Sequence, residues 1–342
     1  MKRVLIVSPM PPLIGGVSIS SGRLYDNLRR DGYDVDYYNL KFSNGRYNTK
    51  IGILLRFMYI PIYVLLHKRY DIIHCHVPGV SRKLYLSLVK PIFFKGAKTV
   101  MTIHGDISSL LRSKPFLFAL RRMDSIICVQ PGDSAKLPDD IRSRSEDIPA
   151  FIMPRIIPDS DVPSDIMDFV GRDDKPLIIH NGAVVLSDKH YDLYGFEDMA
   201  DLYFKLKQAG VGFKMLLIVI GETDTADKRR FVEAIRTRIA GEPDILLVHN
   251  QGFELLPILK YGFMYIRPTK TDGDSLSVRE ALAMGLHTVA SDRTVRPDGV
   301  VTYHNAEELF DKVKALLIDN KRSLCDSNHD FYDQIKSVYD SL

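Results

Sequence analysis

Two carboxylates and two arginines occur close together between residues 267 and 285 of this chain. In the stretch RPTKTDGDSLSVREALAMG, Asp272 and Glu280 are eight residues apart, Arg267 precedes the first acid and Arg279 directly precedes the second. Carboxylates accept hydrogen bonds from hydroxyl groups such as those of a sugar or a ribose, whereas arginine binds phosphate through two parallel N–H groups. The segment therefore indicates a ligand that carries both hydroxyl groups and negative charge.

The same stretch predicts a strand, a loop and a helix. Residues 263–269 are expected to form the strand and residues 276–284 the helix. A helix start offers free N–H groups and a partial positive charge, which suit phosphate. The groups concerned are the backbone amides of Gly273, Asp274, Ser275 and Leu276. A purely structural alternative stays open, because Ser277 and Glu280 fit a capping box and Asp274 or Ser275 fits a plain cap.

Around this stretch, short apolar runs alternate with helical patterns along most of the chain. We expect strands at 3–10, 35–40, 71–76, 98–105, 124–130, 176–185, 215–222, 245–250, 263–269 and 287–292. We expect helices at 17–30, 51–67, 80–95, 108–121, 195–210, 226–239, 276–284, 306–320 and 328–341. This alternation predicts an α/β protein with parallel sheets covered by helices on both faces.

The pattern predicts two doubly wound domains. Residues 131–175 interrupt it with six prolines, and we interpret them as an interdomain connection and hinge. The domains are placed at 1–155 and 165–325, with the C-terminal tail 328–342 packing back on the first. Ligands bind such sheets at the carboxyl ends of the strands, so we expect the 267–285 segment on the rim of a cleft between the two domains.

The charge of the chain is unevenly distributed. Residues 1–130 hold 20 Lys and Arg against 7 Asp and Glu, a net +13, whereas the rest carries −10. This excess points to an anionic partner, either nucleic acid or a phospholipid surface. No aromatic RNA-binding motif accompanies the basic residues, which disfavours nucleic acid.

The three cysteines are far apart in sequence, and the N-terminus resembles a buried strand. We therefore expect a cytoplasmic protein without a disulfide framework.

The apolar stretch KIGILLRFMYIPIYVLLHKRY, residues 50–70, bears on the choice of partner. It is shorter than the ~20 residues that a membrane span needs and is interrupted by Arg56 and Pro61. One interpretation is a packed helix kinked at Pro61. The other is a helix that also lies in the membrane interface, with Lys50, Arg56, Lys68 and Arg69 meeting lipid headgroups on the inner face of the plasma membrane.

Taken together, these motifs resemble those of retaining glycosyltransferases of family 4, which have the GT-B fold of two facing Rossmann-like domains. Asp272-x7-Glu280, followed by ALAMG and HTVASD, is similar to the E-x7-E motif of that family. The resemblance covers nearly the whole chain and is carried further by PPLIGG, YDIIHCHVPG, TIHGD, DSIICVQPGD and LLIVIGE.

The resemblance implies roles for individual residues. Glu280 is expected to bind the ribose of a nucleotide-sugar, Asp272 the hydroxyls of the donor sugar, and the amides of Asp274, Ser275 and Leu276 the distal phosphate. Gly15 and Gly16 are expected to let the first loop approach the diphosphate or acceptor, and His104 to hydrogen-bond the transferred sugar. Tight-turn and packing roles are the alternatives for these last three, and packing is favoured for His74 and His76.

This chain departs from the family in its diphosphate-binding bases. Alanine, Ala183, stands where the family has arginine, and Lys189 is the candidate second base, although Tyr194-Gly195 aligns equally well. Arg267 and Arg279 are expected to compensate for the missing arginine by binding the diphosphate. Asp272, His104 and Lys189 are the resulting candidate catalytic residues.

The resemblance implies a metal-independent hexosyltransferase that uses a UDP- or GDP-linked sugar and no separate cofactor. Its acceptor is expected to be a glycan or a lipid-linked sugar in surface polysaccharide synthesis. An inverting transferase, a sugar phosphorylase and an inactive GT-B binding or scaffold subunit remain alternatives. The absence of a GxGxxG motif argues against a nicotinamide dehydrogenase.

Overall fold

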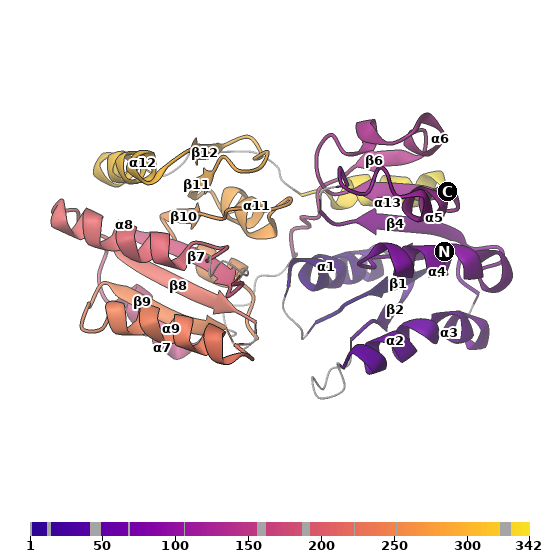
Figure 1. Ribbon diagram of the computed structural model, residues 1–342, viewed down its shortest axis with the longest axis horizontal. Helices are drawn as coiled ribbons and strands as arrows, with labels where there is room; N and C mark the ends of the chain where they lie inside the picture. Colours follow the sequence, from indigo (N-terminus) through magenta and orange to yellow (C-terminus); the bar gives the residue numbers. More distant parts are fainter. Residues whose placement is uncertain are drawn as a thin grey trace. The chain divides into compact units, whose positions relative to one another are not determined.

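A computed structural model of the chain forms two compact units (Figure 1). It describes residues 2–11, 15–41, 49–67, 69–105, 107–155, 162–186, 192–221, 223–250, 252–321 and 330–342. Unit 1 consists of Met1–Arg155 with Asp330–Leu342, and unit 2 of Ile156–His329. Within the described residues, no helix combines the length and hydropathy needed to cross a bilayer.

Unit 1 is built on a six-stranded sheet in the order β2-β1-β3-β4-β5-β6, with every neighbouring pair parallel. Its strands are β1 (Arg3–Ser8), β2 (Asp34–Asn39), β3 (Ile72–Cys75), β4 (Lys98–Ile103), β5 (Ser125–Cys128) and β6 (Ser145–Asp147). The central strands β1, β3, β4 and β5 are buried on both faces, which is why they consist of nearly continuous apolar residues.

Helices cover both faces of this sheet. They are α1 (Gly16–Arg30), α2 (Lys50–Met58), α3 (Ile60–Leu66), α4 (Val80–Phe93), α5 (Lys114–Arg121), α6 (Asp139–Arg142) and α13 (Tyr332–Ser341), with a short 3-10 helix at Ser134–Lys136. The core on one face joins Phe57, Ile60, Leu86 and Phe116 of α2–α5. The core on the other face combines residues of α1 with the C-terminal helix α13.

Two expectations for this half need correction. The segment 131–175 is not a plain connection, because residues 131–155 belong to unit 1 and include β6, which pairs with β5. The 51–67 helix is two helices, α2 and α3, separated at Tyr59 (Figure 1). Pro61 lies in the first turn of α3. Backbone N–H groups in the first turn of a helix have no intrahelical acceptor, so a proline costs no hydrogen bond there.

Unit 2 repeats the architecture with the strand order β12-β11-β10-β7-β8-β9, again with parallel pairing throughout. Its strands are β7 (Leu177–Ala183), β8 (Lys214–Ile220), β9 (Ile245–Asn250), β10 (Met264–Arg267), β11 (His287–Ser291) and β12 (Val300–Tyr303). Its helices are α7 (Ser164–Gly171), α8 (Phe196–Gln208), α9 (Ala226–Arg238), α10 (Leu256–Leu259), α11 (Leu276–Ala283) and α12 (Ala306–Asp319). The short elements β12, α7 and α10 were not expected from the sequence.

Candidate functional site

Three neighbouring strands of unit 2 bring polar residues to the same edge of the sheet. β7, β10 and β11 are adjacent and parallel, so their carboxyl ends lie side by side. Arg267 is the last residue of β10 and Ser291 the last of β11, while Asn181 lies near the end of β7. The loop 268–275 leaves this edge and leads into α11. The 267–285 segment therefore lies where a doubly wound sheet binds its ligands.

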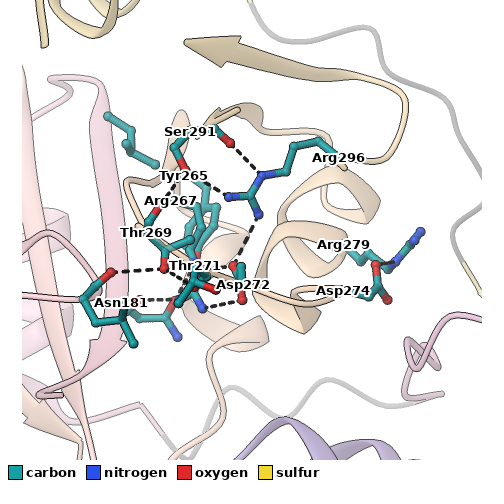
Figure 2. Close-up of polar contacts among 12 residues, drawn as sticks. Asn181, Tyr265, Arg267, Thr269, Thr271, Asp272, Asp274, Arg279, Ser291 and Arg296 are labelled. Atoms are coloured by element: carbon teal, nitrogen blue, oxygen red, sulfur yellow. Dashed lines mark hydrogen bonds and ion pairs between the residues drawn. The ribbon is translucent and has the colours of Figure 1, made fainter. Parts of the chain in front are cut away.

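Asp272 is held between two arginines, as Figure 2 shows. Arg267 donates from Nε to Oδ2 of Asp272 at 3.0 Å and from Nη2 to Oδ1 at 3.4 Å. Arg296, from the loop after β11, donates from Nη1 to Oδ2 at 3.3 Å. Among the described residues, three of the roughly four acceptor positions of the carboxylate are thus used, and one at Oδ1 is open.

All three side chains of this cluster are largely removed from water, with exposed fractions of 9%, 11% and 3% for Arg267, Asp272 and Arg296. Burial opposes the charge on Arg267, but Tyr265 and Asp272 outweigh it and raise the pKa of the guanidinium. For Arg296, burial dominates and lowers the pKa. With two cations and one anion, the cluster presents a net positive charge in a poorly solvated position.

Further hydrogen bonds fasten the loops that carry these groups. Arg296 donates from Nε to the carbonyl of Ser291 at 2.9 Å and from Nη2 to its Oγ at 3.2 Å. Ser291 Oγ donates to the carbonyl of Thr269 at 2.5 Å, and Arg267 Nη1 to the carbonyl of Asn181 at 2.9 Å. The 268–275 loop is therefore tied to the end of β11, and the end of β10 to β7.

Arg279 takes part in a separate ion pair. Its Nε donates to Oδ1 of Asp274 at 2.6 Å, and both side chains are almost fully buried. Figure 2 shows this pair apart from the Asp272 cluster. Arg279 is thus committed to Asp274, and Arg296 rather than Arg279 is the second arginine beside Arg267.

The start of α11 has neither the Ser275 side-chain cap nor the capping box that the sequence allowed. Ser275 is the N-cap residue and makes no capping hydrogen bond through its side chain. Ser277 lies inside the helix, where its Oγ accepts from Asn181 Nδ2 at 3.2 Å, so Ser277 and Glu280 do not form a capping box. Glu280 is 2% exposed and lies one turn into the helix.

A second group of polar residues surrounds a cavity of about 260 Å³ in unit 1. His104 follows β4 and His76 follows β3, and both line the cavity together with Lys83 of α4. The remaining wall is mostly apolar, from Pro9, Val17, Val77, Pro78, Val80, Ile103 and Leu110. His104, the expected partner of the transferred sugar, and His76, expected to be a packing residue, both line this cavity.

The histidines of this region form a connected set. His76 Nδ1 lies 3.0 Å from His104 Nε2, and the rings of His74 and His76 are 4.2 Å apart. His74 in turn contacts Thr102 Oγ1 and the hydroxyl of Tyr339, at 2.6 and 2.5 Å. Burial lowers the pKa of His74 to about 3; burial and, to a lesser extent, Lys83 lower that of His104 to about 4. These histidines are therefore neutral near pH 7.

The remaining predicted residues are less informative. Gly15 is the N-cap of α1 with extended backbone, and an added Cβ would meet Ser18 Oγ only at an ordinary 3.9 Å. Gly16 begins α1. Ala183 ends β7 as the sequence placed it, and Lys189 lies outside the described residues. In the part of the chain that the structure describes, no cluster of three or more His, Cys, Asp or Glu side chains could hold a metal ion.

No family model and no curated protein sequence matches this chain. Solved structures do resemble it over the full length. HepE from Anabaena, crystallised in complex with UDP and glucose, is 13% identical with a TM-score of 0.66, and all of both chains is covered. Sucrose-phosphate synthase from Thermosynechococcus elongatus is 15% identical with a TM-score of 0.70, covering 100% of this chain and 99% of that one.

The catalytic domain of starch synthase IV from Arabidopsis thaliana, bound to ADP and acarbose, is similar at 14% identity and a TM-score of 0.66, again over 100% and 99% of the two chains. At these identities the likeness establishes the fold. The chain has the two-domain α/β architecture of GT-B proteins, which confirms the fold class predicted from the sequence.

Proposed function

We propose that this chain is a glycosyltransferase that transfers a hexose from a nucleotide-sugar to an acceptor hydroxyl. The observation that carries the proposal is the Asp272 cluster beside the start of α11, at the carboxyl edge of the unit 2 sheet in a GT-B fold. HepE was crystallised with UDP-glucose and starch synthase IV with ADP, so a nucleoside diphosphate sugar is the first donor class to test.

The groups at this edge suit the two ends of such a donor. The amides of Asp274, Ser275 and Leu276 are assigned to the distal phosphate, because Ser275 makes no side-chain cap at the helix start. The net positive Asp272 cluster supports negative charge on the diphosphate as it leaves. The open acceptor position on Asp272 is assigned to a sugar hydroxyl and Glu280 to the ribose, with His104 of unit 1 as a further partner of the sugar.

In the proposed reaction the acceptor oxygen forms a bond to C1 of the sugar while the bond from C1 to the phosphate oxygen breaks. The acceptor proton passes to the departing phosphate, and the anomeric configuration is retained. No metal ion is assigned to the site. The proposal extends to a glycan or lipid-linked acceptor in surface polysaccharide synthesis and to peripheral association with the cytoplasmic membrane face.

Nucleotide binding is the first test. UDP, GDP, ADP and their glucose conjugates are titrated into the purified chain, and melting temperature and calorimetric heat are recorded. A ligand that binds only the folded protein raises the melting temperature. We expect one nucleotide to do so in the wild type and much less in Asp272→Asn and Glu280→Gln, whereas Glu307→Gln, an exposed acid on α12, serves as the matched control. If none of the nucleotides binds, the proposal is wrong.

One alternative has an observation in its favour. Ala183 replaces the family's arginine, and Arg267 and Arg296 are already engaged by Asp272, as an inactive binding subunit would allow. Binding of a nucleotide-sugar without donor hydrolysis or transfer would favour that alternative. For an active enzyme, proton NMR of the product's anomeric centre separates retention from inversion, and release of a sugar phosphate in the presence of inorganic phosphate identifies a phosphorylase.

A further inference from the structure

Four helices of unit 1 form one outer layer. The crossovers from β2 to β3, β3 to β4 and β4 to β5 all run in the same direction along the sheet, so right-handed connections place α2–α5 on one face. Their inward residues share a single core, and Tyr85 of α4 donates to the carbonyl of Met58 at 3.0 Å, joining α4 to the α2–α3 pair. Lys90 of α4 donates to the carbonyl of Arg122 after α5. We call the outward side of this layer the α2–α5 surface.

The α2–α5 surface is unusually apolar. Ile51, Leu65 and Leu66 are exposed by 71%, 66% and 67%. The large exposed apolar residues of the four helices and of Tyr59 between them are Ile51, Leu54, Leu55, Met58, Tyr59, Ile62, Leu65, Leu66, Leu88, Ile92 and Phe118. Isolated exposed leucines are common, but soluble proteins rarely expose this many on adjoining helices unless something covers them.

The charge of the same layer has one sign. None of the helices α2, α3, α4 and α5 contains an aspartate or glutamate. Residues 37–123, which span them, hold 15 Lys and Arg against 2 Asp, so the whole +13 excess of the first 130 residues originates here. Lys50, Arg69, Lys95, Lys114 and Arg122, at or close to the ends of these helices, are exposed.

We propose that the α2–α5 surface docks on an anionic lipid membrane. Helices α2 and α3 lie in the interface, with their leucines and isoleucines among the upper acyl chains. The surrounding lysines and arginines reach the phosphate groups of anionic lipids, each contributing on the order of 1 kcal/mol near the surface. Their aliphatic stems lie along the apolar side chains. The charged groups can therefore contact the headgroups while the leucines and isoleucines contact the acyl chains.

Charge complementarity favours this occupant over two others. A second copy of the chain bringing the same face would oppose like charges across the contact. A nucleic acid would neutralise the basic residues but would leave the leucines in water. An anionic lipid surface supplies both an apolar phase and negative charge.

The test is sedimentation of the full chain with phosphatidylcholine vesicles, with and without phosphatidylglycerol. We expect binding only to the anionic vesicles. The triple variant Lys50→Gln, Arg69→Gln, Lys114→Gln is expected to bind about a hundredfold more weakly. The triple variant Arg230→Gln, Arg236→Gln, Lys321→Gln removes the same charge from exposed positions of unit 2 and is expected to bind like the wild type.

A second pair of variants tests the apolar contribution. Leu65→Ser is expected to weaken vesicle binding several-fold. Ile318→Ser, which changes an equally exposed residue of α12 in unit 2, is expected to leave it unchanged. Circular dichroism and melting temperature confirm that each variant is folded.

Failure of the wild type to bind anionic vesicles, or equal loss in both members of either variant pair, overturns the proposal. Concentration-dependent dimers that Leu65→Ser abolishes would assign the surface to a second copy instead. These results are independent of nucleotide binding, because the proposed phosphate-binding residues lie in unit 2 whereas the α2–α5 surface lies in unit 1.

Discussion

At the residue scale, Arg296 connects Asp272 to the neighbouring strand. It donates to Asp272 Oδ2 and to both oxygens of Ser291 from a side chain that is almost fully buried. We expect Arg296→Met to lower the free energy of unfolding by about 2 kcal/mol, because charged hydrogen bonds are lost while Arg267 still balances Asp272. Urea-induced unfolding measures the loss. Arg293→Met, an exposed arginine of the same loop, is the control, and an equal loss in both variants would contradict the assignment.

The position of Arg296 could not be predicted from the sequence. It lies 24 residues after Asp272, beyond α11 and β11, and no local spacing connects the two. Arg279, directly beside Glu280, was the obvious candidate, yet its side chain is committed to Asp274. The sequence shows that residues 267, 272 and 280 share one strand-loop-helix segment, whereas a partner from the loop after the neighbouring strand can be recognised only when the sheet order is known.

A second residue-scale prediction concerns the protonated nitrogen of His104. His76 Nε2 is buried and has no hydrogen-bond partner among the described residues. An orphaned buried N–H is rarer than an orphaned acceptor, so the proton of neutral His76 belongs on Nδ1, which then donates to His104 Nε2. His104 is therefore expected to carry its proton on Nδ1. Nitrogen-15 NMR of the two imidazoles checks this, and a proton on Nε2 of His104 would show it to be wrong.

At the element scale, α13 closes unit 1 from the far end of the sequence. Its buried residues Tyr332, Ile335, Val338 and Tyr339 pack in one core with α1 and the sheet. Tyr339 also contacts His74 Nδ1 through its hydroxyl at 2.5 Å. We expect Tyr339→Phe to lower the free energy of unfolding by about 1–3 kcal/mol, because a buried imidazole nitrogen loses its partner.

Urea-induced unfolding of Tyr339→Phe provides the measurement. Tyr37→Phe removes a hydroxyl from a side chain that is 47% exposed and is the matched control. Equal stability of Tyr339→Phe and the wild type would mean that the hydroxyl contributes nothing to the attachment of α13.

The strands that the sequence predicted well are those that are buried on both faces of the sheet. β1, β3, β4 and β5 are buried on both faces and are predominantly apolar, so they are readily recognised as strands. β6 was missed because Ser145–Asp147 is a polar three-residue edge strand, which among the described strands pairs only with β5. For residues 51–67 the sequence predicted one helix with a kink instead of two helices, because a continuous apolar stretch does not show where one helix ends and the next begins.

At the scale of the whole molecule, buried histidines make stability depend on pH in both units. Burial lowers the pKa of His74 in unit 1 and of His180 in unit 2 from 6.5 to about 3. As the pH falls below about 6.5, the unfolded chain binds protons that the folded chain does not, so stability present above that pH is lost. We expect each such histidine to contribute a loss of up to about 2 kcal/mol at pH 5. Urea-induced unfolding at pH 7 and pH 5 measures it, and unchanged midpoints would contradict the prediction.

The distribution of charge, rather than its sum, determines how the molecule should respond to salt. The net charge is only +3, but unit 1 carries 25 Lys and Arg against 15 Asp and Glu, whereas unit 2 carries 21 against 28. A charge of +3 spread evenly would bind anionic vesicles weakly and with little salt dependence. If the α2–α5 surface docks as proposed, its basic residues lie within about one Debye length, ~10 Å at 0.1 M salt, of the lipid headgroups.

We therefore expect vesicle binding by the wild type to fall steeply as sodium chloride is raised. The Lys50→Gln, Arg69→Gln, Lys114→Gln variant should fall less steeply, because fewer charges remain to be screened. A residual binding that salt does not remove should persist in both and be several-fold weaker in Leu65→Ser, since it comes from apolar contact. Parallel salt curves for the wild type and the charge variant would mean that the basic residues around the leucines play no part in docking.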